Sequence, residues 1–180
     1  MIGSICHRVL EEWDFQASKE AIESLVESAT KWALTIEKIK AEAVVQQQVI
    51  KPQFSPFNTL QIQDTELIKA EVIKILSDFI DSEAYEELQN AQILGREIPI
   101  LLRWDRHIMR GTIDVLYKIG NRIIIADYKT DHVKPTDLQA MAEKYQHQKG
   151  VYIEAVKRCL QIDNPEFKLI FLRLGKSVCI

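Results

Sequence analysis

The sequence predicts an α/β protein in which a central mixed β-sheet is flanked by helices and the N-terminal half is helical. Apolar residues recur at helical spacing through most of residues 1–90, whereas residues 91–180 contain apolar stretches of the alternating or continuous kind that strands show. A helical stretch then separates the third expected strand from the last, which favours a sheet containing both strand directions. We expect one domain over 1–180, with the helical part at 1–90 and the sheet at 91–180.

The helical half begins with a short apolar stripe made of Ile5, Val9, Leu10 and Trp13. Ser18 is expected to cap a longer helix, whose length leaves room for a break near Thr35. The segment 51–56 ends that helix, because its two prolines do not fit a helix interior, and we interpret it as a connection within one domain. Two further helices are expected to be capped by Asp64 and Ser82.

The second half changes to strand periodicity. Three strands are predicted at residues 93–102, 107–117 and 122–128. Gly120-Asn121, between the last two, is a hairpin signal. Pro135 opens a helical stretch that runs to about Leu160 with a break expected at Gly150, and a final strand is predicted at 167–174.

The net charge of −3 conceals an asymmetry between the two halves. Residues 1–102 carry 9 Lys and Arg against 17 Asp and Glu, a net charge of −8, whereas residues 103–180 carry 14 against 9, a net charge of +5. Such asymmetry is a hint of a surface that faces a polyanion. Chance distribution over solvated faces is the alternative, and the charge pattern alone favours it.

The cysteines and the N-terminus indicate a reducing compartment. Three cysteines stand far apart without a Cys-x-x-Cys pair, which fits the cytoplasm and argues against a structural zinc site. The first 15 residues have neither the basic nor the apolar region of a secretory signal, and no apolar run reaches the roughly 20 residues that cross a bilayer. We therefore expect a cytoplasmic protein without a membrane partner.

An acid and an amine follow the apolar run 123–126. Because side chains alternate along a strand, Asp127 and Lys129 are expected to point to one face and Tyr128 to the other. Charged groups at the end of a buried strand are costly unless they are paired or used. A simple surface ion pair is the alternative explanation.

The hairpin brings a second carboxylate to the same place. If the chain folds back at Gly120-Asn121, Asp114 faces Asp127 in the simplest register. Directly opposed like charges destabilise a sheet, but a cation between them removes the objection, and Mg²⁺ prefers carboxylate oxygen. Lys129 beside the metal could orient or deprotonate a water, or neutralise phosphate charge. Glu97 joins this cluster if its strand pairs with that of Asp114, and is otherwise an exposed strand residue.

Two further sets of residues have both a structural and a functional interpretation. His7 lies beside the first apolar stripe, where a histidine is more often a residue at the edge of the core than a ligand. Tyr145, Gln148 and Tyr152 share one helical face. They are either core and rim residues or the lining of a polar groove with stacking and phosphate contacts.

Five short motifs together resemble the nuclease domain of the RecB and AddA type in the PD-(D/E)XK superfamily. In chain order they are GSICHRVLE at 3–11, GREIPI at 95–100, GTID at 111–114, DYKT at 127–130 and YQHQKGVY at 145–152. Each motif alone is weak, but five in the order of the family cover nearly the whole chain. The resemblance implies a restriction-endonuclease-like fold.

The resemblance also implies roles for individual residues. The metal ligands that it implies are His7, Asp114, Asp127 and the main-chain carbonyl of Tyr128. The catalytic residues that it implies are Glu97, Asp114, Asp127 and the catalytic lysine Lys129. The residues that it places near the path of the DNA are Gln148 and Tyr152, to which the shared helical face adds Tyr145.

The resemblance predicts a Mg²⁺-dependent DNA nuclease, of exonuclease type, in DNA recombination and repair, with Mn²⁺ as a possible substitute for Mg²⁺. Family members of this type are usually part of a large helicase, so the resemblance implies a helicase motor as a partner, either in cis or in trans. The sequence itself has no G-x-x-x-x-G-K-[ST] motif and is therefore not expected to power unwinding. An iron–sulfur cluster is not expected, because its four cysteines are missing. Two alternatives remain: a catalytically silent nuclease fold that binds DNA or scaffolds a helicase, and a plain interaction domain.

Overall fold

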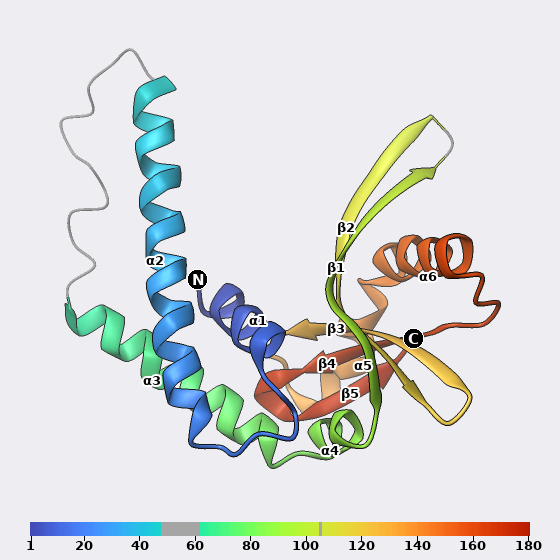
Figure 1. Ribbon diagram of the computed structural model, residues 1–180, viewed down its shortest axis with the longest axis horizontal. Helices are drawn as coiled ribbons and strands as arrows, with labels where there is room; N and C mark the ends of the chain where they lie inside the picture. The colour runs from blue at the N-terminus through green and yellow to red at the C-terminus, as the bar shows by residue number, and fades with distance from the viewer. Residues whose placement is uncertain (48–61, 105) are drawn as a thin grey trace. The chain divides into compact units, whose positions relative to one another are not determined.

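The computed structural model describes residues 1–47, 62–104 and 106–180 (Figure 1). The helices are α1 (Ile2–Glu12), α2 (Ala21–Gln47), α3 (Ile62–Ile80), α4 (Glu83–Gln89), α5 (Leu138–Glu143) and α6 (Gln146–Leu160). The strands are β1 (Gln92–Trp104), β2 (His107–Ile119), β3 (Arg122–Lys129), β4 (Glu166–Phe171) and β5 (Lys176–Cys179). Two 3₁₀ turns, η1 (Pro135–Asp137) and η2 (Leu172–Leu174), complete the described part. The predicted connection at 51–56 lies outside these residues.

The chain forms two compact units, residues 1–75 and 76–180, and the division falls within α3. A single domain over 1–180 therefore stays a prediction. Among the helices of the described part, none combines the length and the apolar character that crossing a membrane requires.

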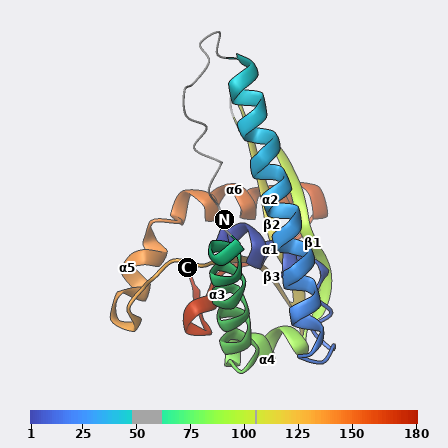
Figure 2. The ribbon, with the colours of Figure 1, turned by 90° about the vertical axis from the view of Figure 1, so that its left-hand side faces the viewer.

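The first unit consists of α1, α2 and most of α3, as the helical periodicity predicts. α2 runs unbroken through Thr35 (Figure 2), so the break for which its length left room is absent, and the Thr35 hydroxyl donates to the Lys31 carbonyl (2.9 Å) inside the helix. The expected caps are also misplaced. α2 begins at Ala21, after a turn closed on the Ser18 carbonyl, and α3 begins at Ile62, so that Asp64 lies in its first turn.

The second unit is built on a five-stranded mixed sheet in the order β1-β2-β3-β4-β5. β3 and β4 are parallel and the other neighbours are antiparallel, which confirms the predicted sheet. The β2–β3 hairpin turns at Gly120-Asn121 as predicted, with Ile119 opposite Arg122. The expected final strand 167–174 is too long, because β4 ends at Phe171 and Gly175 then turns the chain into β5.

Helices cover both faces of this sheet. α6 packs on one face through Val151, Tyr152 and Ala155, which share a core with residues of β2, β3 and β4. On the other face the Phe79 ring of α3 lies edge-on to the Tyr128 ring of β3 and, at 5.5 Å, to the Tyr85 ring of α4. Ser82 caps α4 as predicted by accepting the Tyr85 N–H. The break expected at Gly150 is misplaced, because the helical stretch is interrupted at residues 144–145 between α5 and α6.

Two glycines of this unit differ in what a side chain would meet. Gly150 lies inside α6 with open space where a Cβ would stand, whereas Gly175 has φ +58° and its Cβ would collide with that of Ser82. We expect Gly150→Ala to stabilise the fold by about 0.5–1 kcal/mol, since alanine is the better helix former. Gly175→Ala should destabilise it by more than about 1 kcal/mol. Urea unfolding monitored by circular dichroism measures both, and equal midpoints for the two variants would contradict this description.

Candidate active site

The site begins where the β2–β3 ladder ends. Val115 pairs with Ala126 in the register that the hairpin predicts, and this is the last pair of the ladder toward Asp114. The Asp114 carboxylate accepts a hydrogen bond from the Tyr128 N–H (2.6 Å), although Asp114 is only 6 % exposed. Asp114 is thus tied by its side chain to β3, at the position where main-chain pairing would otherwise continue.

Glu97 lies opposite Asp114 on the neighbouring strand. The pairs Arg96–Val115 and Ile98–Ile113 flank the two residues, and a carboxylate oxygen of Glu97 lies within 4.8 Å of one of Asp114. Glu97 adopts φ +46°, a left-handed conformation that costs a non-glycine residue about 1–2 kcal/mol. Backbone strain of this kind persists where the surrounding structure imposes it, and it concentrates at functional sites.

The regular alternation of β2 is also interrupted here. Ile113 and Leu116 are three residues apart, yet both belong to the core on the α6 side of the sheet. In an unbroken strand, residues three apart point to opposite faces. The backbone therefore changes faces between them, at Asp114.

The paired carboxylates of Glu97 and Asp114 fit a divalent cation. Two like charges in a partly buried setting repel one another, and a cation between them turns the repulsion into attraction. Carboxylate oxygen is the ligand that Mg²⁺ prefers. The donor set of the second unit is therefore consistent with such an ion.

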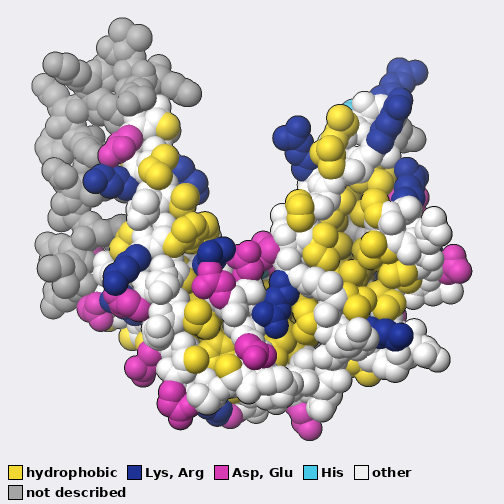
Figure 3. Space-filling model, in the orientation of Figure 1, with side chains coloured by type: hydrophobic (Ala, Val, Ile, Leu, Met, Phe, Trp, Pro, Cys, Tyr) yellow, Lys and Arg dark blue, Asp and Glu magenta, His cyan; other side chains and the backbone are white. Residues whose placement is uncertain are grey.

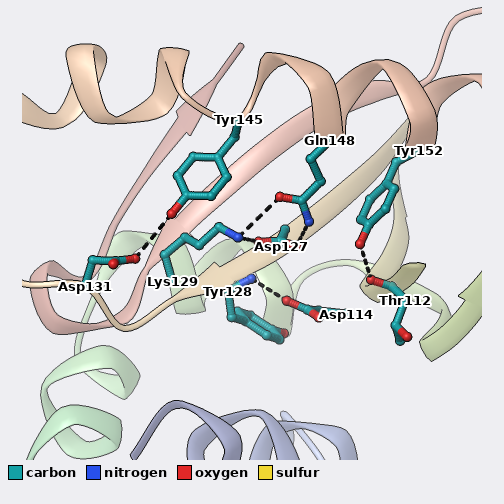
Figure 4. A network of polar contacts seen from close by, with 9 residues as sticks. All are labelled: Thr112, Asp114, Asp127, Tyr128, Lys129, Asp131, Tyr145, Gln148 and Tyr152. Atoms are coloured by element: carbon teal, nitrogen blue, oxygen red, sulfur yellow. Dashed lines mark hydrogen bonds and ion pairs between the residues drawn. The ribbon is translucent and has the colours of Figure 1, made fainter. Parts of the chain in front are cut away.

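Asp127 and Lys129 share a face of β3 as predicted, and Gln148 of α6 connects them (Figure 4). The Lys129 ammonium is ion-paired with the Asp127 carboxylate. Gln148 donates its amide N–H to the other Asp127 oxygen and accepts from the Lys129 ammonium at 3.3 Å. The ammonium also lies 4.1 Å from the centre of the Tyr145 ring, a cation–π contact. Three side chains thus fix one amine.

Tyr145 stands immediately before α6 and is held in turn by Asp131. Its hydroxyl donates to the Asp131 carboxylate at 3.4 Å (Figure 4). The pKa of Tyr145 is raised, first by burial and then by the negative charges of Asp131 and Asp127. The hydroxyl therefore stays protonated near neutral pH and remains a hydrogen-bond donor.

Tyr152 is a residue of the core as well as of the site. Only 7 % of it is exposed, and its hydroxyl donates to the Thr112 carbonyl at 2.7 Å. Its ring lies so close to Gly111 that a Cβ there would stand 2.8 Å from a ring carbon. Burial is the largest cause of its raised pKa, and the charges of Asp127 and Asp114 add to it. Tyr152 thus fixes the backbone two residues before Asp114.

The predicted site residues divide between the two units. The second unit brings together Glu97 with Asp114, and Asp127 with Lys129, Tyr145 and Gln148 through direct contacts. The set that the sequence prediction missed comprises Asp131 and Thr112. Asp131 continues the every-second-residue spacing of Asp127 and Lys129, and this signal could have identified it.

The ligand roles predicted for His7, Asp114, Asp127 and the Tyr128 carbonyl all stay predictions. His7 lies in α1 of the first unit. The Tyr128 side chain points away from the Asp127 face and meets the Phe79 ring edge-on at 6.4 Å. Burial raises its pKa far above the ordinary value, so the phenol stays neutral. A ligand role for Tyr128 would therefore use its main-chain carbonyl.

Comparison with known proteins gives consistent matches. Residues 1–177 match the family model described as the PD-(D/E)XK nuclease superfamily. Similar proteins include an ATP-dependent helicase/nuclease subunit of Streptococcus suis, 26 % identical over 181 residues, which are 95 % of this chain and 12 % of the relative. The protein of the same name from Clostridium kluyveri is 28 % identical over 141 residues, 69 % of this chain and 11 % of the relative. The chain thus spans about a tenth of the length of these curated relatives.

The strained conformation of Glu97 leads to a prediction that separates stability from metal binding. We expect Glu97→Gln and Glu97→Gly each to weaken Mn²⁺ binding at least about tenfold, because each removes a carboxylate ligand. Without metal, the Glu97→Gly variant should be more stable than the Glu97→Gln variant by up to about 1 kcal/mol of unfolding free energy, because glycine adopts positive φ freely.

Calorimetric titration with Mn²⁺ and urea unfolding in EDTA measure the two effects. Glu143→Gln, at an exposed carboxylate of α5, is the matched control for loss of one negative charge. Unchanged Mn²⁺ affinity in both Glu97 variants would exclude Glu97 as a ligand.

Proposed function

Because the chain belongs to the PD-(D/E)XK nuclease superfamily, we propose that it is a Mg²⁺-dependent deoxyribonuclease domain of exonuclease type. The observation that best supports the proposal is the ammonium of Lys129, which Asp127 and Gln148 hold at the end of β3. Tyr128, which precedes Lys129 in β3, donates its main-chain N–H to Asp114, one of the two paired carboxylates. A fixed cationic group so close to paired carboxylates suits phosphodiester hydrolysis.

The residues that would hold the cation are Glu97, Asp114 and Asp127, with His7 and the Tyr128 carbonyl as the further ligands that the family resemblance implies. When bound, Mg²⁺ or Mn²⁺ supplies Lewis-acid stabilisation of a phosphoryl group and acidifies water. Asp127 has one oxygen on the Lys129 ammonium and one on the Gln148 amide, so metal binding at Asp127 would redistribute these contacts.

In this proposal Lys129 acts on the reacting groups. Its ammonium stabilises the negative charge that develops on the phosphate, or, after it has given up a proton, its neutral amine accepts one from the attacking water. Gln148 prevents the ammonium from swinging away, and the Tyr145 ring closes one side of it. Gln148 and Tyr145 are therefore positioning residues for Lys129.

We propose that the DNA passes over Tyr145 and Gln148. Tyr152 belongs to the same helical face but is buried, so its part is to hold the Thr112 carbonyl of β2 against α6. Binding would be mostly to phosphates, without base readout, because residues 103–180 carry a net charge of +5.

We place this nuclease beside a helicase motor, in cis or in trans, in DNA recombination and repair in the cytoplasm. Support comes from the relatives whose names describe a helicase/nuclease, although the chain corresponds to only about a tenth of their length. No disulfide joins Cys6, Cys159 and Cys179 in the described part of the chain, which fits a reducing compartment.

Lys129 separates a nuclease from a silent nuclease fold. We expect Lys129→Ala to slow cleavage of DNA by about a hundredfold or more, as removal of one positioned electrostatic group does. Mn²⁺ binding should survive, because the carboxylates remain. Lys129→Arg should restore little of the cleavage rate, since the guanidinium keeps the positive charge but does not deprotonate and places that charge at a different distance from the main chain.

Single-turnover cleavage of a labelled linear DNA with Mg²⁺ measures this effect. Lys176→Ala, at an exposed lysine of β5, is the matched control. If the wild-type protein cuts no DNA with any divalent metal, the silent fold is the correct interpretation; if Lys129→Ala cuts at the wild-type rate, the role of Lys129 is wrong.

His7 has its own test, based on the imidazole ligand that it would supply. His7→Ala should bind Mn²⁺ more weakly, because it removes one ligand. The thermal midpoint without metal should stay nearly unchanged, because the carboxylates and the sheet are intact. Calorimetric titration with Mn²⁺ and thermal unfolding in EDTA measure the two effects. A large loss of metal-free stability with unchanged Mn²⁺ affinity would make His7 a residue of the core.

A further inference from the structure

The strands β1 and β2 extend well beyond the rest of the sheet. β3 pairs with β2 only from Val115 onward, whereas the β1–β2 pairing continues from Ile98–Ile113 to Trp104–His107. Residues 98–104 and 107–113 therefore form a two-stranded ribbon, here called the arm, which projects from the sheet (Figure 1). The carboxylate pair of Glu97 and Asp114 lies at the base of the arm.

One face of the arm belongs to the core of the second unit. Ile100, Leu102 and Met109 pack with residues of α6. The Arg158 guanidinium, in the last turn of α6, donates to the Arg103 carbonyl at 3.2 Å. These contacts fix the arm to α6, so the outer face has a defined orientation.

The outer face interleaves arginines with exposed aliphatic side chains. Leu101 is 67 % exposed and lies opposite Arg110, while Ile108 is 63 % exposed and lies opposite Arg103. Each aliphatic side chain thus has an arginine directly across the ribbon. Figure 3 shows hydrophobic side chains along the arm and basic side chains gathered toward its end.

The charge of the arm as a whole favours a polyanion over a protein. Residues 101–110 contain three arginines and one histidine against one aspartate. A protein interface of standard size buries about 800 Å² on each partner around an apolar core, whereas the outer face presents two separate aliphatic side chains, Leu101 and Ile108, each opposite an arginine. Arginine binds phosphate with paired hydrogen bonds, a two-stranded ribbon fits a DNA groove, and aliphatic side chains pack between or against bases.

We propose that the arm is a DNA-binding element that holds the substrate at a fixed distance from the carboxylate pair. Arg103 and Arg110 bind backbone phosphates, and Leu101 and Ile108 pack against the sugars or bases between them. This inference rests on the proposed function in one respect, namely that the bound polyanion is the nuclease substrate.

The length of the arm sets that distance. Ile108 is six residues from Asp114, which in a strand corresponds to about 20 Å. Duplex DNA rises about 3.4 Å per base pair, so the arm should contact DNA about six base pairs from the bond that is cleaved. DNA that ends less than about six base pairs from the cleaved bond should gain no binding affinity from the arm.

The test uses two double variants of the full chain and one control. Arg103→Gln with Arg110→Gln removes the charges, and Leu101→Thr with Ile108→Thr removes the exposed aliphatic groups while keeping strand formers. Arg122→Gln removes a guanidinium beside the opposite end of β2 and is the matched control. Circular dichroism checks that each variant keeps its fold.

Fluorescence anisotropy in EDTA then measures binding to labelled duplexes and single strands of about 4 to 24 nucleotides, lengths chosen around the six base pairs estimated above. The arginine variant should bind a long duplex about tenfold or more weakly, and its salt slope should fall by about 1.8 for duplex or 1.4 for single strands. The aliphatic variant should lose affinity with little change in slope. On DNA too short to reach the arm, both variants should bind with the same affinity as the wild type.

The outcomes separate this inference from the proposed function. If both arm variants bind long DNA like the wild type, the inference is wrong, and a protein would be the occupant to seek. If the wild type cleaves no DNA but the arm variants still lose affinity as described, the proposed nuclease fails and the DNA-binding arm stands. Lys129→Ala should retain the dependence of binding on the arm, because it leaves the arm intact.

Discussion

The hydrogen bond from the Tyr128 N–H to the Asp114 carboxylate determines how the second unit is arranged. A side chain takes the place that a main-chain carbonyl would have in a continuing ladder, so β2 and β3 separate at this point. β3 then carries Asp127 and Lys129 toward α6, while β2 leaves with β1 as a ribbon. The bond also satisfies one oxygen of a buried carboxylate, which would otherwise be costly. One charge-assisted hydrogen bond thus defines the edge at which the acidic groups gather.

α6 connects the features that this separation creates. Gln148, in its first turn, holds Asp127 and Lys129, and Tyr152, one turn later, holds the backbone before Asp114. Arg158, in its last turn, holds the arm through Arg103. A helix is rigid along its axis, and these three contacts span about 15 Å at about 1.5 Å per residue. The distance from the amine to the arm is therefore set by helix geometry rather than by a loop.

Much of the sheet followed from local signals in the sequence. Gly120-Asn121 placed the turn and hence the register, and alternation placed Asp127 and Lys129 on one face. The left-handed Glu97 and the change of faces at Asp114 have no such signal, because strand patterns assume regular alternation and an acidic residue is not a marker of positive φ. The hydrogen bonds of Gln148 to Asp127 and Lys129 depend on how α6 crosses the sheet. Helical periodicity identifies a face but not its partner.

The parallel pairing of β3 with β4 has a consequence for the order of folding. The three antiparallel pairs join strands with no α-helix between them in the chain, whereas the segment containing α5 and α6 separates β3 from β4. Parallel pairing across such a long connection is slow, because the entropic cost of closing the loop precedes its contacts. We therefore expect Asp127 and Lys129 to stay hydrated until this connection docks, and Gln148 of α6 to arrive in the step that removes their water. Closing this part of the sheet late would keep the chain from burying these charges before their partners are in place.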